Sequence, residues 1–329
     1  MPAATRYSSA KARDASRVEA RGKGITVKIG LVLPPGAIGN PGHVLSYREL
    51  REYALQAENL GLDSVWIYDH VVFEFPGREP EATLECWTVL TGLAEATQRV
   101  ELGTFVICTA FRNPALLAKM AVTLDEVSNG RLILGVGAGW HEPEFIRFGM
   151  PFDHLVDRFE EAIQIIAPLV REGRVDFQGR YYQANACEML PLPTRRIPLM
   201  IASKQPRMNR LAARFADSWN LSGLPNAQAI VEKRDAVLAA AAAIGRHPST
   251  LEITAGVNVG FPDLPEVANL PGGTLPDGLN GTTEEIAAGL RAFADEGVSH
   301  IQAWLYPLTP EAVRRFAAAV KLAREAGTA

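Results

Sequence analysis

The stretch VELGTFVICTAFRNPALLAKMAVTLDEVSNGRLILGV, residues 100–136, holds two apolar runs around a segment with helical spacing. The runs Val100–Thr109 and Arg131–Val136 are predicted to be buried strands. Between them, Pro114–Val127 is predicted to be a helix, because Pro stands in its first turn and Asn129-Gly130 follow its end. A helix between two buried strands is the repeating unit of a parallel sheet that is covered on both faces.

The same alternation continues in both directions along the chain. Continuous apolar strands joined by helices close most naturally into a barrel when eight such units follow one another. We therefore predict an α/β fold with a single (β/α)8 TIM barrel. The other predicted strands are Lys28–Pro34, Ser64–Tyr68, Pro198–Ser203, Asp217–Leu221, Leu251–Phe261 and His300–Tyr306. The other predicted helices are Ser46–Leu60, Glu85–Thr97, Asp153–Arg171, Pro206–Phe215, Ala227–Ile244, Thr282–Ala294 and Thr309–Ala326.

Two insertions depart from a minimal barrel. Residues 172–197 follow the fourth helix and include a polar, hairpin-like stretch, Val175–Glu188. Residues 261–281 follow the seventh strand and are rich in Pro and Gly. A loop after a barrel strand lies on the face where active sites form, so this second insertion is either an active-site lid or an ordinary surface loop.

Composition excludes several classes of protein. The 329 residues include 33 Lys+Arg and 37 Asp+Glu, a net charge of −4 that favours neither nucleic acid nor an anionic membrane as a partner. No apolar run reaches the roughly 18 residues that a membrane span needs. Cys86, Cys108 and Cys187 lie far apart, which supports neither a disulfide framework nor a zinc site. We expect buried thiols, no bound metal and a cytoplasmic location.

The first residues differ from the rest. Residues 1–27 are basic and rich in Ser and Ala, without the apolar core of a secretory signal. We predict a flexible N-terminal tail over 1–27 and one barrel domain over 28–329. An organelle leader and a tail that packs on a partner subunit are the alternatives, and we expect a homodimer or a higher homo-oligomer.

Polar residues follow three of the predicted strands. Asp69-His70 follow the second strand, where a histidine can carry a proton and a neighbouring carboxylate can raise its pKa. In the alternative, Asp69 caps a helix or binds a backbone N–H. Residues 137–141, GAGWH, follow the fourth strand, and small residues there let a ligand approach the backbone. Residues 203–207, SKQPR, precede a helix whose N-terminus could bind phosphate.

Four stretches resemble the bacterial luciferase-like superfamily of flavin- and F420-dependent oxidoreductases. They are Leu62–His70, Glu85–Thr109, Arg112–Glu144 and Leu211–Asn220, and the likeness runs from Lys28 to the last helix. The resemblance implies a TIM barrel that holds a flavin or deazaflavin ring in its mouth and acts on a small-molecule substrate.

The resemblance also implies roles for individual residues. His70 and Asp69 are implied as the catalytic pair at the ring, and a non-proline cis peptide between Phe105 and Val106 lies beneath it. Residues 137–141 lie near the cofactor tail, and residues 203–205 grip its phosphate. The implied cofactor-binding residues are Asp69, His70, Thr104, Phe105, Val106, Gly137, Ala138, Gly139, Trp140, His141, Ser203, Lys204 and Gln205.

Two departures from the superfamily pattern matter. Many relatives have a Gly-Gly-x-Gly run where this chain has Ala202–Gln205, so Lys204 would replace backbone contacts with charge. Sugar-phosphate dehydrogenases of the F420 group have a Glu where this chain has Trp140, so that substrate is not predicted.

The resemblance points to two cofactors. GVGAGWHEPE, residues 135–144, and Asp69-His70 resemble the F420-dependent branch. SNGR, residues 128–131, and VDFQGRYY, residues 175–182, resemble the FMNH2-dependent monooxygenases, which receive reduced flavin from a flavin reductase. We expect F420-dependent hydride transfer to or from a small organic substrate, with the FMNH2-dependent two-component monooxygenase as the alternative. A Schiff-base aldolase that uses Lys204 and a non-catalytic flavin-binding barrel are more remote alternatives.

Overall fold

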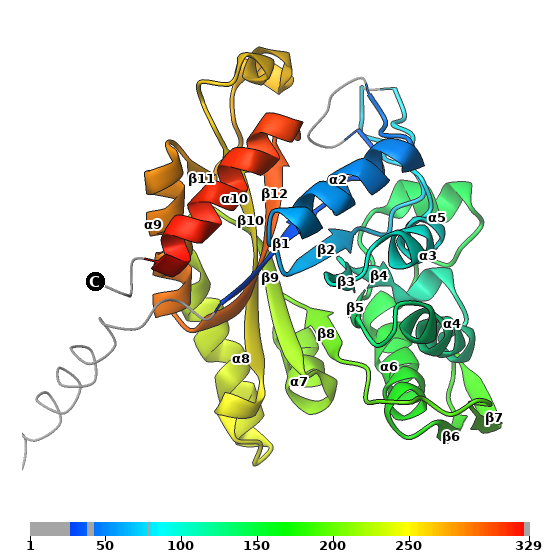
Figure 1. Ribbon diagram of the computed structural model, residues 1–329. Coiled ribbons are helices and arrows are strands. Elements are labelled where there is room, and N and C mark those ends of the chain that lie inside the picture. Colours follow the sequence, from blue (N-terminus) through cyan, green and yellow to red (C-terminus); the bar gives the residue numbers. More distant parts are fainter. Residues whose placement is uncertain (1–26, 38–42, 78, 326–329) are drawn as a thin grey trace, which may run out of the picture.

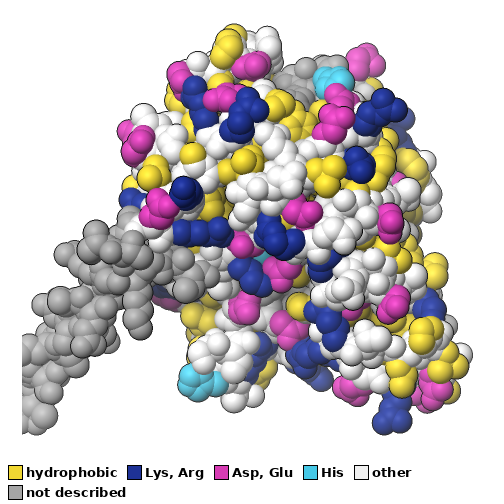
Figure 2. Space-filling view, viewed as in Figure 1, with side chains coloured by type: hydrophobic (Ala, Val, Ile, Leu, Met, Phe, Trp, Pro, Cys, Tyr) yellow, Lys and Arg dark blue, Asp and Glu magenta, His cyan; other side chains and the backbone are white. Residues whose placement is uncertain are grey.

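The computed structural model describes residues 27–37, 43–77 and 79–325. The predicted N-terminal tail over residues 1–27 lies outside these ranges apart from Val27. No helix in the described ranges is both long and apolar enough to cross a membrane. On the face seen in Figure 2, cationic and anionic side chains are interspersed rather than gathered by sign.

The predicted (β/α)8 barrel is confirmed (Figure 1). Its strands are all parallel, and the circle closes because β12 pairs with β1 and β9 pairs with β10. The strands are β1 (Lys28–Val32), β2 (Ser64–Ile67), β3 (Glu101–Thr104), β5 (Leu132–Gly137), β8 (Leu199–Ala202), β9 (Ser218–Leu224), β10 (Glu252–Gly260) and β12 (Val298–Tyr306). The surrounding helices are α2 (Tyr47–Asn59), α3 (Cys86–Ala96), α4 (Pro114–Val127), α6 (Leu155–Arg171), α7 (Pro206–Phe215), α8 (Val231–Ala243), α9 (Thr283–Asp295) and α10 (Pro310–Glu325).

Helix starts follow the local chemistry of the sequence. Ser46 with Glu49 and Thr282 with Glu285 form the two predicted capping boxes at the starts of α2 and α9. The predicted bounds of α4 are confirmed, and Asn113 caps it by accepting the N–H groups of Ala115 and Leu116.

Two predicted elements differ in the structure, and one helix was not predicted. The predicted strand 100–109 is broken into β3 and β4 (Ile107–Cys108), with a cis peptide between Phe105 and Val106 as the resemblance implied. The predicted helix 227–244 begins as a 3-10 turn, Ala227–Ile230, before α8. A short helix that the sequence did not predict, α5 (Glu142–Arg147), follows the loop after β5.

Both insertions have structure of their own. Residues 172–197 contain the predicted hairpin, formed by β6 (Arg174–Gln178) and β7 (Gln183–Glu188). The hairpin is fastened to α6 because Glu161 accepts three consecutive N–H groups, from residues 180–182. Residues 261–281 form two 3-10 turns, at the top of Figure 1, and β11 (Leu279–Asn280), which pairs with β10. None of them lines the cavity described below, so their lid role stays a prediction.

Large side chains fill the barrel interior, and glycines make room for them. Trp66, Phe105 and Met200 form an inner cluster, separate from the apolar layer between strands and helices. Gly103 stands beside Trp66 on β3, and a Cβ there would lie 2.0 Å from the indole. Below Trp66, Ser64 accepts the indole N–H and bonds to His300, whose pKa burial lowers to about 3. His300 is therefore a neutral part of the core.

We expect Gly103→Ala to lower the free energy of unfolding by about 1–3 kcal/mol, because the added methyl group overpacks the barrel against Trp66. Urea unfolding of both proteins measures the difference. Ala242→Ser on the exposed side of α8 is the control and should change stability by less than about 0.5 kcal/mol. Equal stabilities of Gly103→Ala and the wild type would show that Trp66 is not held as described.

Candidate active site

The C-terminal ends of β2, β3, β5, β8 and β9 surround a cavity of about 630 Å³. Among the cofactor-binding residues predicted from the sequence, all except Thr104 and His141 line it. Further lining residues that the sequence did not single out are Ile107, Cys108, Glu144, Val156, Ala202, Met208, Asn220, Leu221 and Ser222. Six of these lie within β4, β8 and β9, so a place on a strand that reaches the C-terminal face was the signal available for them.

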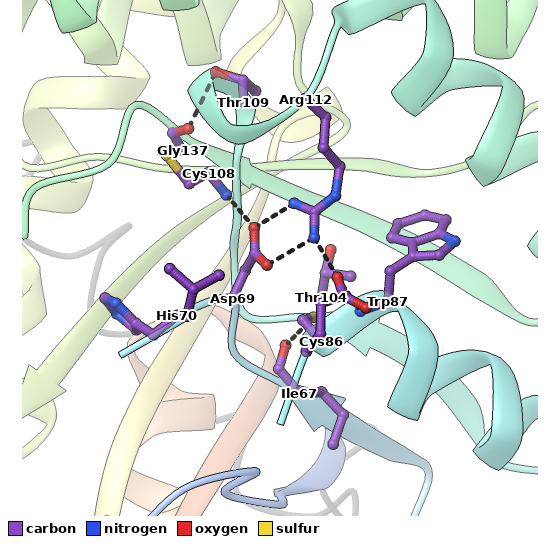
Figure 3. A network of polar contacts seen from close by, with 12 residues as sticks. Ile67, Asp69, His70, Cys86, Trp87, Thr104, Cys108, Thr109, Arg112 and Gly137 are labelled. Carbon is purple, nitrogen blue, oxygen red and sulfur yellow. Dashed lines mark hydrogen bonds and ion pairs between the residues drawn. The ribbon is translucent and has the colours of Figure 1, made fainter. Parts of the chain in front are cut away.

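Asp69 and His70 follow β2 but make contacts on different sides of it (Figure 3). Successive side chains of an extended chain point to opposite faces. The Asp69 carboxylate accepts two hydrogen bonds from Arg112, at 2.7 and 3.0 Å, and the N–H of Cys108 at 3.0 Å. Arg112 also pairs with Glu85, the residue that caps α3. Asp69 therefore joins β2 to β4 and to the starts of α3 and α4.

Burial dominates the electrostatics of this cluster. Asp69 is 3% exposed, and burial raises its pKa while the hydrogen bonds and charge of Arg112 act against that rise. Burial on its own lowers the pKa of the Arg112 guanidinium. The hydrogen bond and charge of Asp69 outweigh this effect, together with the charge of Glu85, and raise the pKa of Arg112 above its usual value. The expectation that Asp69 assists His70 directly is corrected here, because its carboxylate faces Arg112.

Glu144 takes the place beside His70 that the sequence suggested for Asp69. Its carboxylate oxygens lie 3.0 and 3.1 Å from Nδ1 of His70. Glu144 lies on α5, the short helix that the sequence reading missed. A signal was present, because Pro143 between two acidic residues is typical of a helix start.

His141 supports the site from behind the cavity wall. It is buried, it does not line the cavity, and its Nε2 accepts the N–H of Glu74 at 3.1 Å. Burial lowers the pKa of His141, which favours the neutral ring that this hydrogen bond requires. Its predicted contact with the cofactor is therefore corrected to a contact within the protein.

Thr104 is also turned away from the cavity. Its hydroxyl donates to the carbonyl of Gly135 at 2.7 Å and accepts the N–H of Gly135 at 2.8 Å. These two bonds join β3 to β5 just before the Phe105–Val106 peptide interrupts the strand. The prediction that Thr104 binds the cofactor is therefore corrected.

Glycines and a neutral thiol form the floor of the cavity. A Cβ on Gly137 would lie 2.9 Å from Val106, and one on Gly139 would lie 2.6 Å from the sulfur of Cys108. Gly139 also has a φ of 87°, which side chains disfavour. Burial raises the pKa of Cys108, so its thiol is uncharged.

The opposite end of the cavity carries one exposed cation. Lys204 makes no hydrogen bond or ion pair with the described residues, whereas Arg207 is held by Asp157 at 2.5 Å and Glu160 at 2.6 Å. Gln205 precedes α7 without a side-chain cap, so the first N–H groups of that helix are open. The Ser203 hydroxyl already donates to Asn209 and accepts from Trp219, which argues against its predicted contact with phosphate.

The described residues contain no group of three or more His, Cys, Asp or Glu side chains that could hold a metal ion. The family model of the luciferase-like monooxygenases matches residues 27–269. The chain belongs to this family. Relatives of this luciferase-like protein include F420-dependent dehydrogenases and flavin monooxygenases, and all of these are oxidoreductases.

Two relatives represent these two groups. An F420-dependent glucose-6-phosphate dehydrogenase from Amycolatopsis mediterranei is 36% identical over 178 residues, 52% of each chain. The luciferase-like chain thus spans about half the length of this relative. A pyrimidine monooxygenase, RutA, from Agrobacterium fabrum is 29% identical over 248 residues, 69% of this chain and 66% of that one.

Solved structures share the fold of the luciferase-like chain at low identity. An F420-dependent secondary alcohol dehydrogenase, in complex with an F420-acetone adduct, has a TM-score of 0.75 at 20% identity, covering 91% of this chain and 99% of that chain. Riboflavin lyase RcaE, with modified FMN and substrate riboflavin, has a TM-score of 0.74 at 18% identity and covers 92% of both chains.

We expect Arg112→Met to destabilise the protein by about 3–5 kcal/mol, because it leaves the Asp69 carboxylate buried without its cation. Burial then raises the pKa of Asp69, with the N–H of Cys108 still acting against the rise. When the pKa of a carboxyl group is higher in the folded than in the unfolded state, the folded protein loses stability as the pH rises from the lower pKa through the higher one. The deficit should therefore be smallest in acid and grow from about pH 4 upward, measured by urea unfolding at several pH values.

The double variant Asp69→Asn/Arg112→Met is the matched control for this cluster. Its neutral amide should recover part of the lost stability and remove the pH dependence, because no carboxyl group remains to titrate. A deficit in Arg112→Met that is the same at pH 4 and pH 8 would contradict the ionic account.

Proposed function

We propose that this protein is an F420-dependent oxidoreductase that transfers a hydride to or from a small organic substrate. The proposal rests on one observation: His70, the Phe105–Val106 bend, the Gly137–Gly139 loop and Lys204 line a single cavity at the barrel mouth. The sequence relation to F420-dependent dehydrogenases supports this cofactor.

The lining fits a flat ring with an anionic tail. Gly137 and Gly139 leave backbone open where a Cβ would collide with Val106 or Cys108. Lys204 and the N–H groups at the start of α7 supply positive charge at the other end. Phe105, Val106 and the glycine loop would hold the ring, and Lys204 and Gln205 would hold the phosphate of the tail.

The protein itself would orient the cofactor and the substrate in the cavity and supply a group for proton transfer. When bound, the deazaflavin supplies hydride transfer. His70 lies at the cavity wall and would accept or return the substrate proton. Aromatic side chains surround the His70 ring, with the centroid of Phe73 at 4.2 Å and that of Tyr68 at 5.7 Å.

Trp140 argues against a sugar-phosphate substrate. It is 61% exposed at the cavity rim, and its ring centroid lies 5.5 Å from that of His70. In the sugar-phosphate dehydrogenases that the sequence resembles, a Glu occupies this position. A small substrate with an apolar face suits the indole better.

The FMNH2-dependent monooxygenase remains the second candidate, because a RutA monooxygenase is 29% identical to this chain over 69% of its length. In that case a flavin reductase would be the partner protein. The aldolase alternative loses support, because the side chain of Lys204 is exposed and lacks the apolar surroundings that activate a Schiff-base lysine.

A direct comparison of cofactors tests the proposed function. Cofactor-free protein is titrated with F420 and, separately, with FMN, and binding is followed by fluorescence and calorimetry. We expect F420 to bind at least about tenfold more tightly, a difference of roughly 1.4 kcal/mol. Tighter binding of FMN would favour the monooxygenase, and binding of neither would overturn both candidates.

We expect Lys204→Ala to weaken binding of the whole cofactor by about tenfold to a hundredfold, because a charge-assisted contact with the phosphate is lost. The loss should shrink as salt is added, because salt already screens the contact in the wild type. Calorimetric titration at two salt concentrations measures both effects.

Two controls separate the tail from the ring. Arg207→Ala should leave affinity unchanged, because Asp157 and Glu160 already occupy that guanidinium. A tail-free deazaflavin should bind Lys204→Ala and the wild type equally. If the variant loses as much affinity for the tail-free ring, Lys204 lies at the reaction centre instead.

A further inference from the structure

The carboxylate of Glu144 is buried and has two donors. Its side chain is 1% exposed, and both oxygens lie within 3.1 Å of Nδ1 of His70. One oxygen also accepts the N–H of Val71 at 3.1 Å. A buried carboxylate is costly unless it is hydrogen-bonded, so these contacts account for its presence inside the protein.

The contact with Glu144 determines where His70 carries its proton. An ionised carboxylate has no hydrogen to donate, so Nδ1 must be the donor. A neutral imidazole has one N–H, which leaves Nε2 with a free lone pair. Nε2 has no hydrogen-bond partner among the described residues, and His70 lines the cavity.

We infer that Glu144 is a positioning residue that fixes His70 in its Nδ1–H tautomer and keeps Nε2 free to take a proton from the substrate. This inference rests on the proposed function, in which His70 handles the proton. Glu144 acts through His70, as a carboxylate orients the imidazole in other catalytic pairs.

The other described titratable groups near His70 make no hydrogen bond to its ring, and the buried Tyr68 meets it only edge to face, with ring centroids 5.7 Å apart. Asp69 faces Arg112, and Nε2 of His141 accepts the N–H of Glu74. The remaining neighbours are aromatic rings, with the centroid of Phe73 at 4.2 Å and that of Trp140 at 5.5 Å. In the described part of the chain, Glu144 is thus the one carboxylate that contacts this imidazole.

Further contacts hold α5 against the loop after β2. Arg147 of α5 pairs with Glu74, and the N–H of Glu74 donates to His141, just before α5. Glu74 therefore links the same two segments as Glu144 does, but it makes no contact with His70. This gives a matched control, because Glu74→Gln weakens the link between the segments and leaves the Glu144 contact intact.

Nitrogen NMR of the cofactor-free protein tests the inference. The protein is labelled with ¹⁵N at histidine and studied near pH 9, where an ordinary imidazole is neutral. The His70 signals are assigned by their loss in His70→Gln. We expect the wild type to carry hydrogen on Nδ1 and a bare Nε2.

Glu144→Gln separates a positioning role from a merely structural one. The amide can donate to Nδ1 as well as accept from it, so His70 should move toward the Nε2–H tautomer. Glu74→Gln should keep the wild-type tautomer. Thermal unfolding and the other histidine signals show that each variant is folded. If Glu144→Gln unfolds, the wild-type spectrum tests the inference by itself, because it shows which nitrogen of His70 carries the hydrogen.

Either of two results would overturn the inference: an Nε2–H tautomer in the wild type, or an unchanged His70 spectrum in folded Glu144→Gln. The proposed function fails separately. Titration of the same samples with F420 and FMN tests it, and absence of binding would remove the proposed function while leaving the tautomer result as measured.

Discussion

The ion pair between Asp69 and Arg112 is the contact on which the active-site wall depends. Asp69 follows β2, and the N–H that it accepts from Cys108 fastens β4 beyond the interrupted third strand. Arg112 immediately precedes the cap of α4, and its bond to Glu85 reaches the cap of α3. The pair of buried Asp69 and partly buried Arg112 thus joins two strands and two helix starts. Replacement of such a pair by apolar side chains is often neutral for stability, which suggests that the directional contacts are its main contribution.

This cluster also explains why His70 has a different carboxylate. The side chains of Asp69 and His70 point in opposite directions, so that Asp69 faces the helices and His70 faces the barrel mouth. His70 therefore needs an acceptor from another segment, and α5 supplies Glu144. The wall of the cavity is held from two sides, by Arg112 behind β2 and by α5 beside the loop that follows it.

The fold was predictable from the sequence because its signals are long and repeated. Helices such as α4 show several turns of apolar spacing and explicit caps, and the buried strands are continuous apolar runs. The cavity was predictable for the same reason, since residues after parallel strands gather at one face. The short α5 has less than two turns, too few for a period to show.

The errors at the site share one physical origin, the alternation of side chains along an extended chain. Because they are adjacent in the sequence, Asp69 and His70 were predicted to act together in catalysis. Thr104 and Phe105 were likewise both predicted to bind the cofactor. Phe105 lines the cavity at the barrel mouth, while Thr104 binds β5. Asp69 and His70 both reach the cavity wall, but the Asp69 carboxylate is held by Arg112. Trp140 and His141 divide in the same way, one at the rim and one buried behind it. A run of polar residues after a barrel strand therefore splits into residues that face a ligand and residues that hold them in place. In this protein the second group includes Asp69, Thr104 and His141, and it sets the positions from which the first group can act.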